Sequence, residues 1–189
     1  MASSLRWTST DLQSLRDDGK TYEIVGGELY VSKQPNVYHQ GACGALFAEL
    51  RSWSKQARLG IPILAPGLIL ADDDDVAPDV VWISNHRLAA ALEADGKLHS
   101  APELVVEVLS PGSTNEHRDR EAKLKLHSRR GIGEYWIADW KLREIQVYRR
   151  KDARLVLSAT LYEADVLTSP LLPDFTCKVS ELFEDIPRG

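Results

Sequence analysis

In two places of the sequence an acidic residue stands inside an apolar run. Glu107 interrupts the valines and leucines of PELVVEVLS at 102–110, and Asp79 lies behind Pro78 in VAPDVVWIS at 76–84. An ionised carboxylate in such a setting is costly unless it is paired, protonated or bound to a metal. Two carboxylates on neighbouring strands can converge, and their oxygens suit Mg²⁺ or Mn²⁺. The alternatives are a buried ion pair at Glu107 and a turn cap at Asp79.

A lysine on the next predicted helix can reach the same point. The helix covers residues 115–130, NEHRDREAKLKLHSRR. Its i, i+4, i+7, i+8 and i+11 positions share one face and are Asp119, Lys123, Leu126, His127 and Arg130. Because Leu126 is apolar, this face is expected to lean on the sheet, with Lys123 pointing towards Glu107. A solvated basic helix is the alternative, since several arginines crowd the segment.

The elements that must position these residues alternate between strand and helix patterns. The unbroken apolar character of 102–110 predicts a central strand covered on both faces. Gly26-Gly27 predicts a hairpin turn, and the four aspartates at 72–75 are expected to form a solvated turn rather than a Ca²⁺ loop. The order of elements predicts an α/β domain: a mixed β-sheet flanked by helices, with hairpin additions. The expected helices are 35–59, 86–96 and 115–130, with a last short one in VSELFED; the expected strands are 61–71 (broken at Pro66-Gly67), 79–84, 102–110, 134–139, 144–150 and 154–162.

Length and composition limit the class of protein. The chain has 189 residues, of which 43% are hydrophobic and 27% charged, as expected of a single domain spanning 1–189. The formal net charge of −5 argues against a surface that holds nucleic acid non-specifically. Two isolated cysteines give neither a metal motif nor a disulfide framework, which favours the cytoplasm. No apolar run approaches the roughly 18 residues of a membrane span, so no membrane partner is expected.

The order and spacing of four segments resemble a known family. They are Pro78-Asp79, ELVVEVLSPGST at 103–114, RDREAK at 118–123 and GIGEYWIAD at 131–139. Together they are similar to the putative restriction endonuclease family within the PD-(D/E)xK nuclease superfamily, from about Tyr22 to the final helix. The resemblance implies a restriction-endonuclease-like fold, with a core at about 20–165 and a C-terminal tail at 166–189.

The resemblance assigns the main site residues one by one. Asp79 matches the PD aspartate and Glu107 the acidic residue of the (D/E)xK half-motif. The lysine expected two residues after Glu107 is Leu109 here. In this family the basic role is thought to move onto the following helix, where Lys123 matches in the D-x-x-x-K frame that starts at Asp119.

Further positions match the family less specifically. Glu23 matches an acidic residue of the first hairpin and His39 a histidine that enters the long helix; each is either a supporting site residue or a structural cap or hairpin partner. His127 stands where the family usually has tyrosine, which indicates a tolerated packing change. Basic residues of the predicted helix either contact phosphates or form a solvated face: Arg118, Arg120, Lys125 and Arg129.

The implied activity is that of a divalent-metal-dependent DNA endonuclease. Asp79, Glu107 and the backbone carbonyl of Val108 would hold Mg²⁺, with Mn²⁺ as a substitute, and Lys123 would orient or deprotonate the attacking water or neutralise developing charge. Two other functions remain open. One is a catalytically inactive nuclease-fold module that binds a partner or nucleic acid, which Leu109 and the net charge of −5 favour. The other is a hydrolase of a small phosphate ester. By resemblance, the partner is DNA and the expected assembly a homodimer.

Overall fold

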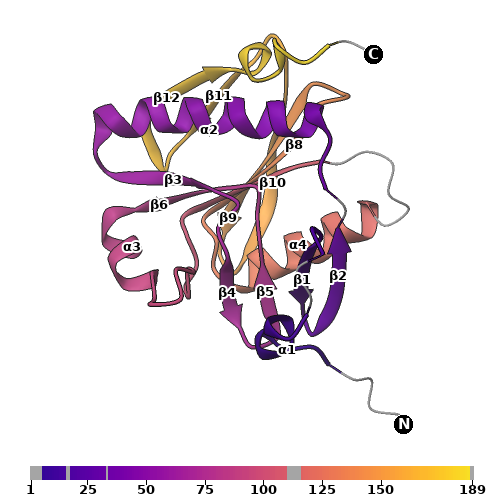
Figure 1. The fold of residues 1–189 in the computed structure, drawn as a ribbon. Coiled ribbons are helices and arrows are strands. Elements are labelled where there is room, and N and C mark those ends of the chain that lie inside the picture. Colours follow the sequence, from indigo (N-terminus) through magenta and orange to yellow (C-terminus); the bar gives the residue numbers. More distant parts are fainter. Residues whose placement is uncertain (1–5, 16–17, 33, 110–115, 188–189) are drawn as a thin grey trace.

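The computed structural model describes residues 6–15, 18–32, 34–109 and 116–187 (Figure 1), with the backbone alone for 116–119. Its centre is a six-stranded sheet in the order β10-β9-β8-β7-β6-β3. Strands β7 and β8 are parallel, and the other neighbours are antiparallel. The predicted mixed sheet is therefore confirmed. The bounds are β3 Gly60–Leu64, β6 Val80–Ser84, β7 Leu104–Val108, β8 Glu134–Asp139, β9 Glu144–Lys151 and β10 Arg154–Tyr162.

Strand β7 lies in the middle of this sheet, as its apolar run predicts. It sits between β6 and β8, and all five of its residues are buried. Side chains of a strand alternate between its faces. Val106 and Val108 accordingly belong to one hydrophobic cluster of the core, whereas Val105 and Leu109 belong to another. Glu107 therefore shares its face of the sheet with Val105 and Leu109.

Helices cover both faces of the central sheet. Figure 1 shows α2 on one side and α4 on the other. The Asn36 side chain caps α2 by accepting a hydrogen bond from the His39 amide at 2.9 Å, which fixes where this helix begins. Helix α4 is the crossover between parallel strands β7 and β8. Among the described helices, none is long and apolar enough to span a membrane. The helix bounds are α1 Ser9–Gln13, α2 Val37–Ala57, α3 Asn85–Ala91, α4 Glu116–Arg129 and the 3₁₀ helix η1 Val179–Phe183.

Two smaller sheets complete the fold. The first has the order β2-β1-β5-β4, and its β1–β2 hairpin turns at Gly26-Gly27, where positive φ angles of 60° and 80° suit glycine. The second is a hairpin in the tail. The bounds are β1 Thr21–Val25, β2 Glu28–Ser32, β4 Leu68–Ala71, β5 Asp74–Val76, β11 Val166–Ser169 and β12 Leu172–Lys178.

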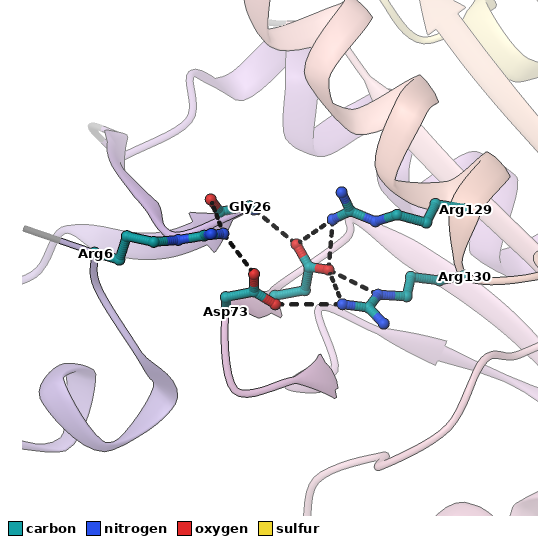
Figure 2. A network of polar contacts seen from close by, with 6 residues as sticks. Arg6, Gly26, Asp73, Arg129 and Arg130 are labelled. Atoms are coloured by element: carbon teal, nitrogen blue, oxygen red, sulfur yellow. Dashed lines mark hydrogen bonds and ion pairs between the residues drawn. The ribbon is translucent and has the colours of Figure 1, made fainter. Parts of the chain in front are cut away.

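The prediction of a solvated turn at 72–75 is wrong for its second half. Asp74 and Asp75 belong to β5, where their exposed fractions are 0% and 4%. Figure 2 shows that Arg129 and Arg130, at the end of α4, both converge on the carboxylate next to Asp73 in the chain. Burial of this carboxylate is possible because cations from a distant part of the sequence neutralise it.

Candidate active site

Strand register brings the two acidic residues of the sequence motif together. In the antiparallel β6–β7 pair Val80 lies opposite Val106. Continuing this antiparallel register by one residue sets Asp79, which immediately precedes β6, opposite Glu107. The Asp79 Oδ2 also accepts a hydrogen bond of 2.7 Å from the amide of Val108. This bond ties the end of β7 to the start of β6 and fixes the Asp79 carboxylate beside the strand that carries Glu107.

Lys123 reaches this point from α4. Its Nζ lies 3.1 Å from Glu107 Oε1 and 3.1 Å from Glu23 Oε2. The inward orientation expected from helical spacing is thus what the structure shows, and Leu126, 1% exposed on the same face, packs in the core. The ammonium bridges a carboxylate of the central sheet to one of the β1–β2 hairpin.

Leu109 occupies the position at which an E-x-K motif has its lysine. Its side chain is 7% exposed and lies in the core cluster on the same face of the sheet as Glu107. In an E-x-K motif, a lysine at this position would lie on the same face of the sheet as the glutamate. In this chain the leucine side chain packs there against apolar neighbours. The ammonium near Glu107 comes instead from Lys123, on the helix α4 that covers this face.

Glu23 and His39 hold the acidic residues from opposite sides. The Oε1 of Glu23 accepts a hydrogen bond of 3.0 Å from the amide of Ala77, two residues before Asp79. On the α2 side, His39 Nε2 lies 3.3 Å from Asp79 Oδ2. Both side chains therefore contact the site, rather than only a cap or a hairpin partner.

Cys43 was missed by the sequence reasoning. Its Sγ lies 3.4 Å from His39 Nδ1, and the residue is 4% exposed. A signal was available, because Cys43 follows His39 by one helical turn and so shares its face of α2. The imidazole thus contacts both a thiol and the Asp79 carboxylate.

Burial and the neighbouring charges together set the ionisation of the site. Burial raises the pKa of Glu107 to about 8 against the opposing effect of the Lys123 ammonium, and Asp79 and Glu23 raise it further. Burial alone would lower the pKa of Lys123, but Glu107 and Glu23 outweigh it and hold that pKa well above its ordinary value. Lys123 is therefore a cation at neutral pH.

Other residues of α4 have different places. His127 is 0% exposed, its ring centroid lies 4.8 Å from that of Tyr135, and burial lowers its pKa to about 3. It packs in the core, in line with the predicted packing change. Arg129 pairs with Asp74 while 55% of its side chain stays exposed, and its contact with phosphate stays a prediction. The side chains of Asp119 and Arg118 lie outside the described residues.

Arg120 and Lys125, the other two residues considered for phosphate contacts, lie near acidic groups. The Nη2 of Arg120 is 3.4 Å from Asp139 Oδ2, and Lys125 Nζ is 3.9 Å from Glu121 Oε2. Lys125 is largely exposed, with 80% of its side chain in contact with solvent. These contacts fit a solvated helix face at Lys125 and leave the phosphate role of both residues a prediction.

One solved structure has a similar fold, and one family model matches the sequence. One solved structure, described as a putative nuclease belonging to DUF820 from Anabaena variabilis ATCC 29413, superposes with a TM-score of 0.74 at 18% identity, covering 94% of this chain and 97% of that one. The type IIG restriction endonuclease BpuSI matches with a TM-score of 0.36 at 18% identity, over 78% of this chain and 15% of that one. No curated protein matches significantly. A family model, Uma2, described as putative restriction endonuclease, matches residues 8–180. With that match spanning most of its length, the chain belongs to the Uma2 family.

Proposed function

We propose that this protein is a divalent-metal-dependent DNA endonuclease of the PD-(D/E)xK type. Membership of a family described as putative restriction endonucleases supports nuclease activity and DNA as the substrate. The metal dependence and the roles of individual residues are proposed from the site itself. Asp79 and Glu107, with the backbone carbonyl of Val108, are the proposed ligands of Mg²⁺ or Mn²⁺.

One observation carries the proposal: the site has too few cations for its carboxylates. Among its described side chains, Glu23, Asp79 and Glu107 gather around the single ammonium of Lys123. When all three carboxylates are ionised, the excess is two negative charges, which a divalent cation would balance. The ligands are hard oxygen atoms, the type that Mg²⁺ selects. Burial is the main cause of the raised pKa of Glu107, and the charges of Asp79 and Glu23 add to it, so a cation bound here would favour the ionised form.

The residues of the chain have distinct proposed roles. When bound, Mg²⁺ supplies Lewis-acid chemistry, polarising a phosphodiester and making water a better nucleophile at neutral pH. Lys123 Nζ contacts Glu107 and Glu23, and from this place it would stabilise negative charge that develops on the phosphate, orient the attacking water or deprotonate it.

Glu23 and His39 are proposed as positioning residues. Glu23 holds the ammonium of Lys123 from the hairpin side, while its second oxygen is fixed by the Ala77 amide. His39 restrains the Asp79 carboxylate from α2. A homodimer that cuts both strands remains a further proposal, made by resemblance to nucleases of this fold.

Plasmid nicking tests the proposal directly. Wild-type protein with Mg²⁺ or Mn²⁺ should nick supercoiled DNA, and Asp79→Ala and Glu107→Ala should each reduce the rate at least ~100-fold. Glu144→Gln is the matched control, because Glu144 is another buried strand glutamate, 8% exposed, that lies outside this site. It should retain the wild-type rate.

The same assays distinguish the two alternative functions, a DNA-binding module and a hydrolase of a small phosphate ester. Folded wild-type protein that leaves plasmid, linear duplex and single-stranded DNA intact with either metal, yet retards DNA on a gel, would replace the endonuclease with the binding module. Metal-dependent hydrolysis of a small phosphate ester without cleavage of any DNA would instead favour the third function.

A further inference from the structure

A second set of potential ligands adjoins the oxygen-rich site. His39, Cys43 and Asp79 each place one ligand atom within 4.8 Å of the others. His39 and Cys43 are 5% and 4% exposed, and the Asp79 side chain is 22% exposed. His39 and Cys43 are therefore buried on one face of α2. Asp79 is partly exposed, so an ion can reach the three ligands from solvent on its side.

The chemistry of these three ligands differs from that of the magnesium site. A thiolate, an imidazole and a carboxylate form a donor set that zinc binds well and magnesium does not. Bond lengths of zinc to sulfur and nitrogen imply ligand separations of roughly 3.3–3.6 Å in a tetrahedral site. The two ring nitrogens of His39 face different partners: Nδ1 lies 3.4 Å from Cys43 Sγ, and Nε2 lies 3.3 Å from Asp79 Oδ2. An ion would use one of these nitrogens, so the ligand that faces the other nitrogen has to move towards the ion. Because the three ligand atoms lie within 4.8 Å of one another, their separations have to shorten by at most about 1.5 Å to match a tetrahedral site.

We propose that His39, Cys43 and Asp79 form a binding site for a thiophilic divalent ion of the zinc class. Binding replaces the thiol proton: the S–H bond of Cys43 breaks, a sulfur–metal bond forms, and the proton leaves to solvent. Three protein ligands leave a fourth position open. Nothing in this step requires an oxidant or reductant.

The shared Asp79 gives the site a regulatory consequence, which rests on the proposed endonuclease function. Asp79 is also a proposed ligand of Mg²⁺, and its Oδ2 is the oxygen nearest His39. A zinc-class ion that recruits this carboxylate withdraws it from the oxygen site. Zinc is therefore expected to inhibit the magnesium-dependent reaction.

Cobalt binding tests the site independently of activity. The full chain is titrated with Co²⁺, which replaces Zn²⁺ and gives a thiolate-to-cobalt charge-transfer band in the near ultraviolet. The band should appear in wild-type protein and disappear in Cys43→Ser. Cys177→Ser is the matched control, since Cys177 is the other cysteine of the chain and is also buried, at 3% exposed. It should keep the band, and His39→Gln should weaken Co²⁺ binding at least ~10-fold.

Each opposite result overturns the proposal. A wild-type protein without the band has no thiolate site, and a band that persists in Cys43→Ser, or is lost only in Cys177→Ser, places the ion elsewhere. Circular dichroism checks that each variant is folded; if Cys43→Ser is not, Cys43→Ala takes its place.

Inhibition of nicking then tests the shared ligand. Zn²⁺ should inhibit wild-type nicking at a concentration at least ~10-fold lower than for Cys43→Ser, each rate being normalised to the same variant without zinc. Equal inhibition of both would refute the competition for Asp79. If the wild type does not nick DNA at all, the proposed endonuclease function fails, while the cobalt band still decides whether the ion site exists.

Discussion

Two buried acidic clusters lie along α4, and they are built in opposite ways. At the end of the helix, Asp74 is 0% exposed, and its carboxylate oxygens accept hydrogen bonds from Arg129 at 2.7 and 3.0 Å and from Arg130 at 2.7 Å (Figure 2). The amide of Gly26 adds a further bond at 2.7 Å. We call this the Asp74 cluster. Its cations match or exceed its negative charge.

Earlier on the same helix, the Glu107 cluster contains Glu23, Asp79, Glu107 and Lys123. Here one ammonium is shared between two carboxylates, and a third carboxylate raises the pKa of Glu107 further. Burial of acid is thus no guide to function by itself. The ratio of nearby cations to carboxylates separates the cluster that neutralises its own charge from the one that is proposed to bind a metal ion.

Matched amide substitutions give the largest expected contrast, which is in activity. Glu107→Gln removes a proposed metal ligand and should lower metal-dependent nicking at least ~100-fold, whereas Asp74→Asn should stay within about 5-fold of wild type, measured below its melting temperature. If both variants fold and lose the same share of the nicking rate, the two clusters do not differ in their importance for activity.

For stability we expect the opposite: Asp74→Asn should have the larger effect and Glu107→Gln the smaller one. Asp74→Asn removes the charge that compensates Arg129 and Arg130 and should lower the free energy of unfolding by about 2–3 kcal/mol. Glu107→Gln should not lower it, because the raised pKa keeps Glu107 mostly protonated at pH 7, so the amide replaces a group that is already neutral. Urea denaturation at pH 7 measures both, and a larger loss for Glu107→Gln would identify the Lys123–Glu107 contact as a structural ion pair.

The pH dependence of Glu107→Gln sharpens the second result. Since the pKa of Glu107 is raised to about 8 from 4.5, the native state holds a proton that the unfolded state releases between these values. Wild-type stability from this group is therefore lost as pH rises from about 4.5 to 8. Glutamine does not titrate, so the free energy of unfolding of the variant should increase relative to that of the wild type between pH 5 and pH 8, by roughly 3–4 kcal/mol. A difference that stays constant with pH would show that Glu107 is ionised throughout.

Added metal should stabilise only through the Glu107 cluster. At a concentration of ten times its dissociation constant, Mg²⁺ should raise the free energy of unfolding by about 1.4 kcal/mol in wild-type protein and equally in Asp74→Asn. Glu107→Gln should show no rise at the same concentration. Thermal shifts with and without Mg²⁺ measure this, and Na⁺ at equal ionic strength controls for screening.

His127 lies between the clusters and gives the smallest expected effect. Both ring nitrogens are buried and, among the described residues, have no hydrogen-bond partner. His127→Phe should therefore raise stability by about 1 kcal/mol at pH 7. Because burial lowers the pKa of His127 to about 3, wild-type stability falls as pH drops below 6.5, and the advantage of phenylalanine should grow there. Destabilisation by both His127→Phe and His127→Leu at every pH would instead indicate that the imidazole has a polar partner.

The sequence supports prediction of the elements and of the meeting of Asp79, Glu107 and Lys123. An apolar run marks β7 as central, and helical spacing places Lys123 beside Leu126 on the inward face. These inferences succeed because strand alternation and helical period are local geometric rules.

The partners of buried charges could not be predicted in this way. Asp74 and Arg129 lie 55 positions apart, and no local pattern shows that their side chains meet. Without knowledge of their partners, four consecutive aspartates are expected to be exposed to solvent. Asp74 can be buried only because the arginines at the end of α4 neutralise its charge. Cys43 was overlooked for a different reason, because a single cysteine at helical spacing from a histidine carries little signal without Asp79 beside them.

The crossover position of α4 has a consequence for how the protein folds. Parallel neighbours such as β7 and β8 pair only after the connecting segment closes over the sheet, whereas antiparallel neighbours need only a tight turn. In this chain that segment is α4, which carries Lys123 onto Glu107. A strand-borne lysine would be in place as soon as its strand formed. Here the ammonium should arrive only when this segment closes slowly over the sheet, so partly folded chains with only their antiparallel hairpins formed should lack the proposed nuclease activity.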